Sequence, residues 1–170
     1  MTRLSGARVV LREWRPEDAP AVEAWADDTE VRAYLVRGAE ELRREPEVAM
    51  AEAARSPRLE YWLALEHEGG VVGSAVLRVE SNRHRRGEIG YVVRRDRWGL
   101  GLATEAARLL LAFGFDELRL ERVWATCHPR NAASARVLER IGMEREGLLR
   151  AHYLAHDGTR VDAVLYAIVR

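Results

Sequence analysis

The segment from Arg97 to Glu105 (RWGLGLATE) has the residue types and spacing of an anion-binding turn. Gly99 and Gly101 would let the backbone approach a ligand closely, because glycine has no Cβ atom. An amphipathic stretch follows, so the unpaired amides and the positive dipole end of a helix would face the same ligand. These features suit a phosphate or a pyrophosphate. A tight strand-to-helix turn that needs glycine for its own geometry would give the same local pattern.

Two other phosphate-binding motifs do not match this spacing. A P-loop requires Gly-x-x-x-x-Gly-Lys-Ser/Thr, and the chain has no lysine, since all 27 of its basic residues are arginine. A dinucleotide fingerprint would need a third small residue where this chain has Thr104, and too little chain remains for a doubly wound fold.

Cys127 and His128 are a second pair that could do chemistry, because a histidine can activate a cysteine nucleophile. Neighbouring residues on a strand point to opposite faces, however, so these side chains would not meet. A buried thiol near a sheet end is the simpler interpretation. His152 and His156 fall on an expected strand and its turn with no third ligand, so we predict no metal site.

The elements that must position these residues can be predicted from hydrophobic periodicity and turn signals. The expected strands are residues 8–14, 59–66, 71–79, 88–93, 122–128, 145–154 and 160–169. Tight turns at 68–70 and 157–158 would make two antiparallel hairpins, and residues 81–87 would form a basic loop.

Helices are expected between these strands. One begins at Pro16, and two short ones, divided at Pro46, fill residues 30–55 as a variable lid. A longer helix follows the glycine turn and ends near Gly114, and a short one over 131–141 is closed by Gly142. The order predicts an α/β (α+β) fold: a single mixed, mostly antiparallel sheet of six to seven strands flanked by helices. A right-handed parallel crossover would join the strands at 88–93 and 122–128.

Composition limits the class of protein. The 170 residues fit one domain, residues 1–170, which would bury roughly 70% of the surface of the unfolded chain. Acidic and basic residues balance at 27 each, so no net field would attract nucleic acid or an anionic membrane. The single cysteine excludes an internal disulfide, and neither a long apolar stretch nor a signal sequence is visible. We therefore expect a cytoplasmic protein.

Three stretches of the chain together resemble the GNAT superfamily of N-acetyltransferases, and within it the RimJ/RimL type. They are LREWRPEDAPAVEAW near the start, GEIGYVVRRDRWGLGLATEAARLLLAFGF in the middle, and NAASARVLERIGMEREGLLR followed by DGTRVDAVLYAIVR. The coenzyme loop of the superfamily, Gln/Arg-x-x-Gly-x-Gly/Ala, matches residues 98–103 except at Trp98, where the RimJ/RimL branch is similar. The resemblance implies a GNAT-like acyl-CoA N-acyltransferase fold, with acetyl-CoA as the co-substrate.

The resemblance also implies which residues bind acetyl-CoA. Backbone amides would hold the pyrophosphate, and the strand at 88–93 would splay from its parallel neighbour so that pantetheine pairs with groups near Val92 and Val93. A preorganised amide there would face the developing oxyanion. By themselves, these two valines look like any core residues. The expected coenzyme-binding residues are Val92, Val93, Arg97, Trp98, Gly99, Leu100, Gly101, Leu102, Ala103, Thr104 and Asn131.

Acetyl transfer would need a base and a donor to the leaving sulfur. An α-amino group titrates near about 8 and a lysine near about 10.4, so a proton must be removed at neutral pH. Glu88 is the candidate base, directly or through water, although it could be a charged strand end beside an arginine-rich loop. The resemblance places Ser134 near the sulfur as the candidate acid, with Tyr153 and Tyr166 as weaker competitors. Asn131 and Ser134 would equally suit a helix N-cap and first turn.

The acceptor site is the least determined part. The resemblance puts one wall of the acceptor site in the closing hairpin, which contains Arg150, His152 and Asp162. These residues could select the substrate or could be solvated strand positions. Large aromatic side chains could line the cleft or belong to the core; they are Trp14, Trp25, Tyr34 and Trp62.

We expect the acceptor to be a protein N-terminal amine, as on a ribosomal protein, or a small-molecule amine such as an aminoglycoside, a polyamine or an amino acid. The alternative is a non-catalytic module that senses acetyl-CoA. The candidate base Glu88 and the candidate acid Ser134 are both present, which argues against a loss of catalysis. A homodimer is expected from the family alone.

Overall fold

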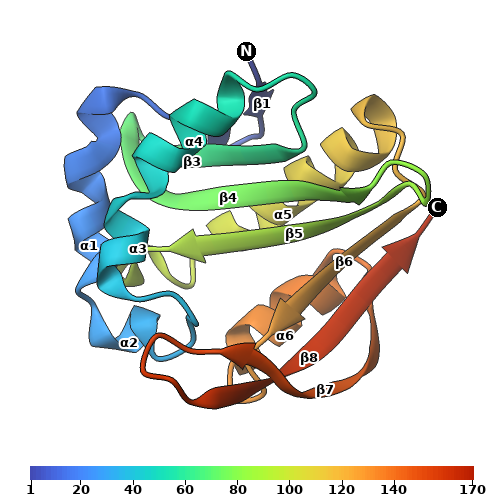
Figure 1. Ribbon diagram of the computed structural model, residues 1–170. Helices are drawn as coiled ribbons and strands as arrows, with labels where there is room; N and C mark the ends of the chain where they lie inside the picture. Colours follow the sequence, from blue (N-terminus) through green and yellow to red (C-terminus); the bar gives the residue numbers. More distant parts are fainter.

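Eight strands form one sheet in the order β1-β2-β3-β4-β5-β6-β8-β7 in the computed structural model, which describes residues 1–170 (Figure 1). They are β1 (Arg3–Ser5), β2 (Val10–Glu13), β3 (Glu60–His67), β4 (Gly70–Ser81), β5 (Arg86–Val93), β6 (Arg122–Cys127), β7 (Glu144–Leu154) and β8 (Arg160–Val169). Every neighbouring pair is antiparallel except β5 and β6, which confirms the mixed sheet. The predicted number of strands was too low, because β1 has only three residues, too few for a strand period to be recognised in the sequence.

The parallel strands β5 and β6 pair along only part of their length. Their register covers three residue pairs and ends where Glu88 faces Trp124, although β5 runs on to Val93 and β6 to Cys127. Figure 1 shows the two arrows diverging beyond this point. The Arg94 amide donates to the Val72 carbonyl, 2.9 Å away. By the alternation of an antiparallel ladder, the backbone groups of Tyr91 and Val93 therefore face the opening.

Short helices cover one face of the sheet. They are η1 (Pro16–Val22), α1 (Glu23–Ala26), α2 (Thr29–Arg32), α3 (Ala39–Arg43) and α4 (Glu45–Ala53). The predicted division near Pro46 falls at Arg44, because proline fits the first turn of α4, where its missing N–H costs nothing. A second break, at residues 33–38, separates α2 from α3. Beneath these helices lies a smaller core that contains Trp14 and Trp25.

The other face of the sheet carries the main core under α5 (Leu102–Ala112) and α6 (Ala132–Arg140). The α-helix ends at Ala112, near the predicted end at Gly114, but this glycine does not cap it, because the chain continues as a π-helical turn, η3 (Phe113–Glu117). Gly114 is buried, and a Cβ atom there would lie 3.1 Å from the side chain of Leu77. Close packing explains this glycine. Gly142, with φ of 89°, does close α6 as predicted.

A buried ion-pair network fixes η1 to the sheet. Arg12 of β2 is only 6% exposed and donates to both oxygens of Asp18, at 2.7 and 2.9 Å, and to Glu66 at 2.7 Å. Burial alone would raise the pKa of Asp18, but the hydrogen bonds from Arg12 and from the Arg15 amide hold it below its usual value. The network therefore joins η1 to β2 and β3.

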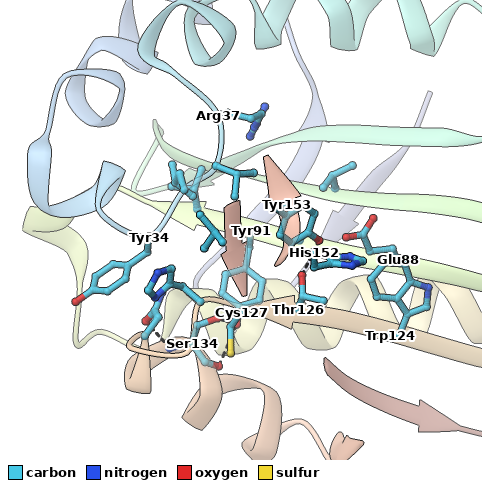
Figure 2. Close-up of a pocket in the computed structure, with 18 of the residues that line it drawn as sticks. Tyr34, Arg37, Glu88, Tyr91, Trp124, Thr126, Cys127, Ser134, His152 and Tyr153 are labelled. Atoms are coloured by element: carbon cyan, nitrogen blue, oxygen red, sulfur yellow. Dashed lines mark hydrogen bonds between the residues drawn. The ribbon is translucent and has the colours of Figure 1, made fainter. Parts of the chain in front are cut away.

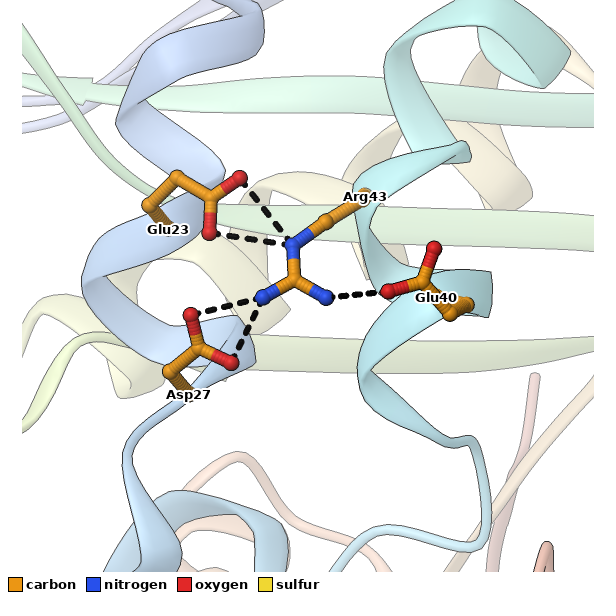
Figure 3. Close-up of polar contacts among 4 residues, drawn as sticks. All are labelled: Glu23, Asp27, Glu40 and Arg43. Carbon is orange, nitrogen blue, oxygen red and sulfur yellow. Dashed lines mark hydrogen bonds and ion pairs between the residues drawn. The ribbon is translucent and has the colours of Figure 1, made fainter.

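An exposed ion-pair network joins two of the short helices, α1 and α3. Arg43 of α3 contacts Glu23 at 3.0 Å, Asp27 at 2.6 Å and Glu40 at 2.5 Å (Figure 3). Glu23 belongs to α1 and Asp27 follows it directly, so a single guanidinium links α1 to α3.

None of the helices in the fold is long and apolar enough to cross a membrane.

Candidate active site

A cavity of about 500 Å³ lies where β5 and β6 part, and 22 residues line it (Figure 2). They come from residues 34–37 of the lid, from β3, β4, β5 and β6, from the start of α6 and from the β7–β8 hairpin. Figure 2 shows Glu88 on one side, near His152 and Trp124, and Ser134 on the other, near Tyr91 and Cys127. The structure thus brings both predicted catalytic residues to one cavity.

Asn131 and Ser134 lie at the cavity wall in the roles that helix capping predicts. Asn131 Oδ1 accepts a hydrogen bond of 3.0 Å from the Ser134 amide, which is an N-cap for α6. This bond uses the backbone of Ser134 and leaves its hydroxyl free. The structural and the functional interpretation are therefore compatible.

Tyr91 is a cavity residue that the sequence reasoning missed. Its hydroxyl lies 3.1 Å from Ser134 Oγ and 3.4 Å from the Ser134 carbonyl oxygen. Burial raises the pKa of Tyr91, although the contact with Ser134 opposes this. The available signal was a tyrosine in the middle of an otherwise apolar predicted strand.

The glycine turn has the backbone geometry that both interpretations require. Gly99 and Gly101 have φ of 79° and 76°, in the left-handed region that favours glycine. The amides of Gly99, Leu100 and Gly101 donate no backbone hydrogen bond, and the first turn of α5 leaves further amides unpaired. The turn thus needs glycine for its own shape and also presents free donors.

Side chains of the turn are mostly occupied elsewhere. Leu102 is 1% exposed and Thr104 is buried, so only their amides could face a ligand, and Arg97 lies within 4 Å of Glu68 and Asp96. The Trp98 indole N–H donates to the Val93 carbonyl at 2.7 Å, while 45% of the residue stays exposed. Trp98 therefore fastens the turn to the end of β5.

A second cavity, of about 480 Å³, adjoins Gly101 and Thr104. Arg8 donates to the Leu100 carbonyl at 2.5 Å and pairs with Glu105 at 3.0 Å. Arg108 and Arg140 also line this cavity. Sequence reasoning missed these arginines, which come from three separate segments and make the surroundings of the turn basic.

Burial and a neighbouring arginine act on the pKa of Glu88 in opposite directions. Its side chain is 20% exposed, and Oε2 accepts a hydrogen bond of 3.1 Å from Arg78. Burial raises the pKa of Glu88 above its usual value, although Arg78 opposes this. The nearby loop arginines pair elsewhere, Arg85 with Glu121 and Arg86 with Glu80. Glu88 is thus a cavity residue rather than a partner of the basic loop.

The closing hairpin contributes part of the wall, as the resemblance implied. His152 and Asp162 line the cavity, whereas Arg150 does not. Asp162 accepts from the Ala151 amide at 2.7 Å, within a β7–β8 register shift.

The two competing tyrosines separate in space. Tyr153 lines the cavity, and its hydroxyl lies 2.8 Å from Thr126 Oγ1. Tyr166 is 4% exposed, does not line the cavity and donates to Glu139. Position therefore favours Tyr153 over Tyr166 as a competitor of Ser134.

The four large aromatic candidates also separate. Tyr34 and Trp62 line the cavity, whereas Trp14 and Trp25 are buried in the smaller core. Two guanidinium groups lie over the Trp62 ring, that of Arg37 at 5.0 Å and that of Arg78 at 4.5 Å from its centroids. Both arginines line the cavity and were not predicted.

Cys127 and His128 both reach the cavity wall, but no hydrogen bond joins them. Burial raises the pKa of the Cys127 thiol, which disfavours the reactive thiolate. His128 instead accepts from the Arg130 amide at 3.1 Å, and burial lowers its pKa. No group of three or more His, Cys, Asp or Glu side chains is arranged to hold a metal ion.

Comparison with known proteins places this geometry among acetyltransferases. Residues 8–144 match the acetyltransferase (GNAT) domain family. The uncharacterized N-acetyltransferase YnaD of Bacillus subtilis (strain 168) is 33% identical over 84% of this chain and 83% of its own length. YoaA, an uncharacterized N-acetyltransferase of the same strain, is 29% identical over 96% and 94%. The structure of Mycobacterium smegmatis RimJ in complex with CoA-disulfide superposes with a TM-score of 0.87 at 27% identity, covering 99% of this chain and 87% of that one.

Proposed function

Since this chain belongs to the acetyltransferase (GNAT) family and is an acetyl-CoA-dependent acyltransferase, we propose that it is of the RimJ/RimL type and acetylates the N-terminal amine of a protein. The observation that carries the proposal is the cavity between β5 and β6, which has Glu88 on one side and Ser134 on the other. The fold likeness to the RimJ structure supports the type.

The charge of the cavity supports this acceptor over a polycation. Arg37 and Arg78 line it together with Glu88 and Asp162, so positive and negative side chains balance. A site for a polyamine would gain from an excess of carboxylates, because opposite charges must compensate one another when they are desolvated.

The residues present fit acetyl-CoA. The amides of Gly99 to Gly101 and of the first turn of α5 are free donors for a pyrophosphate, next to Arg8. The Tyr91 backbone and the Val93 amide face the opening between the strands, whereas Trp98 already occupies the Val93 carbonyl. Val92 instead pairs with Ser74 of β4 and contributes its side chain to the wall. Acetyl-CoA supplies the thioester that the amine attacks.

Glu88 is proposed to take the proton of the amine. An α-amino group has a pKa of about 8, so it is mostly protonated at neutral pH, and a base with a raised pKa is well suited to removing its proton. Burial raises the pKa of Glu88 in this direction. Ser134, beyond Tyr91 in the same cavity, is proposed to donate to the sulfur as the carbon–sulfur bond breaks.

The test combines binding and turnover. Thermal unfolding is measured with and without acetyl-CoA, and a saturating ligand at 100 times its Kd should add about 2.7 kcal/mol of stability. Thiol release is then followed with peptides that carry a free N-terminus, with the same peptides blocked at the N-terminus but containing lysine, and with polyamines and aminoglycosides.

Turnover only with free N-termini is the expected result. Turnover with polyamines or aminoglycosides alone would contradict the proposed acceptor but not the acyltransfer. A thermal shift without any turnover would instead support a sensing module.

A further inference from the structure

Tyr91 and Ser134 form a hydrogen-bonded pair inside the cavity. The Tyr91 hydroxyl lies 3.1 Å from Ser134 Oγ, and both residues line the cavity. Tyr91 comes from β5 and Ser134 from the first turn of α6, so the pair bridges the opening between the splayed strand and the helix. No other side chain makes a hydrogen bond to the Ser134 hydroxyl or to the Tyr91 hydroxyl.

Either hydroxyl of this pair could be the donor, and the inference takes the arrangement in which Tyr91 donates. Tyr91 stays protonated because burial raises its pKa, so its hydroxyl keeps a proton that it can donate. Its possible acceptors are Ser134 Oγ at 3.1 Å and the Ser134 carbonyl at 3.4 Å, and the first is closer. When Oγ accepts from Tyr91, the serine proton is free to point elsewhere in the cavity.

We infer that Tyr91 is a positioning residue, which acts through Ser134 by holding its hydroxyl proton toward the sulfur of the leaving thiolate. This inference rests on the proposed function. The inference adds Tyr91 to the residues of the proposed function. Tyr91 lies on β5, outside the glycine turn, whereas Ser134 lies on α6.

The chemical step balances without a new reactant. The amine nitrogen bonds to the acetyl carbon, the carbon–sulfur bond breaks with its electron pair on sulfur, and the amine proton passes to Glu88. The Ser134 O–H gives a hydrogen bond to the sulfur as charge develops there, and the free thiolate takes its proton from water. Tyr91 keeps its proton throughout, so it lowers the barrier only through the orientation of Ser134.

A double-mutant cycle tests this inference. Ser134→Ala, Tyr91→Phe and the double variant are compared in kcat and in the KM for acetyl-CoA. We expect about a 100-fold loss of kcat for Ser134→Ala. Tyr91→Phe should lose about 10-fold, as for one lost hydrogen bond, with KM unchanged. The double variant should equal Ser134→Ala, because Tyr91 has nothing left to orient. Tyr61→Phe is the control, since Tyr61 of β3 packs on Phe113 and does not line the cavity.

Each outcome separates this inference from the proposed function. If the wild type releases thiol but the two losses multiply in the double variant, Tyr91 acts independently of Ser134 and the inference is overturned. The same holds if Tyr91→Phe leaves kcat unchanged or mainly raises KM. If the wild type binds acetyl-CoA but releases no thiol with any amine, the proposed function fails, and this inference fails with it.

Discussion

The proposed coenzyme site and the proposed acceptor side of the cavity are built in different ways. The proposed coenzyme site uses two short segments, residues 97–104, which lie outside the cavity lining, and residues 131–134, and it presents mainly backbone amides. The proposed acceptor side gathers side chains from six strands and from residues 34–37; they include Arg37, Trp62, Arg78, Glu88, Trp124, His152 and Asp162. Backbone recognition depends on a local turn, whereas side-chain recognition depends on the register of distant strands. We therefore expect backbone recognition to tolerate side-chain changes better than side-chain recognition does.

The largest loss of kcat should come from replacing Glu88 on the proposed acceptor side. Glu88→Gln keeps the shape of the side chain but removes the base, so we expect kcat to fall by about 100-fold to 1000-fold. The thermal shift with acetyl-CoA should stay the same, because Glu88 is proposed to act on the acceptor and not on the coenzyme. The matched control is Glu121→Gln, since Glu121 is exposed, pairs with Arg85 and lies outside the cavity. Equal losses in both variants would show that Glu88 has no specific role.

On the coenzyme side, two glycines with the same conformation can be compared. Gly99 and Gly69 have φ of 79° and 78°, and a Cβ atom at either would meet nothing within 4 Å. Alanine at each should cost about 1 kcal/mol of stability through left-handed strain. Only Gly99→Ala should weaken acetyl-CoA binding, by about 10-fold, because it displaces free amides, whereas Gly69 lies in the β3–β4 turn. Isothermal titration measures this, and equal affinities would contradict the amide-based site.

A smaller change should appear in the pH profile when Arg78 is replaced. Arg78 holds down the pKa of Glu88, which burial has already raised. Arg78→Met removes the opposing charge, so the pKa of Glu88 should rise further. Because the base acts only when deprotonated, the acidic limb of kcat against pH should move to higher pH. A limb that stays in place, or moves to lower pH, would exclude Glu88 as its source.

The smallest effect is expected at the exposed lid network of Figure 3. Arg43→Met removes the contacts to Glu23, Asp27 and Glu40, but solvent and salt screen charges at such exposed positions. We expect a small fall in Tm that disappears at high salt, with kcat/KM for the acceptor unchanged. A large loss of acceptor kcat/KM with normal acetyl-CoA binding would show that this network shapes the acceptor side.

Errors in the sequence-based prediction have a common cause. The sequence predicts that Gly114 marks a helix end, but the role of this glycine is to let η3 pack closely on Leu77 of β4. Tyr91 looked like an ordinary strand residue because its partner, Ser134, is 43 residues away. Arg8 reaches the coenzyme turn across an even longer separation in sequence, from the start of the chain to Leu100. Each of these roles belongs to a contact between distant segments.

The amino-acid sequence by itself determined the order of the strands from β2 onward, the glycine turn before α5 and the Asn131 cap of α6, because periodicity, positive φ and capping are local properties of the chain. The tertiary structure alone decided where β5 leaves β6, and therefore which side chains share one cavity. It also decided that burial raises the pKa of Glu88 and that Tyr91 meets Ser134. Burial and contact across a sheet depend on packing between residues far apart in the chain, and no local pattern contains that information.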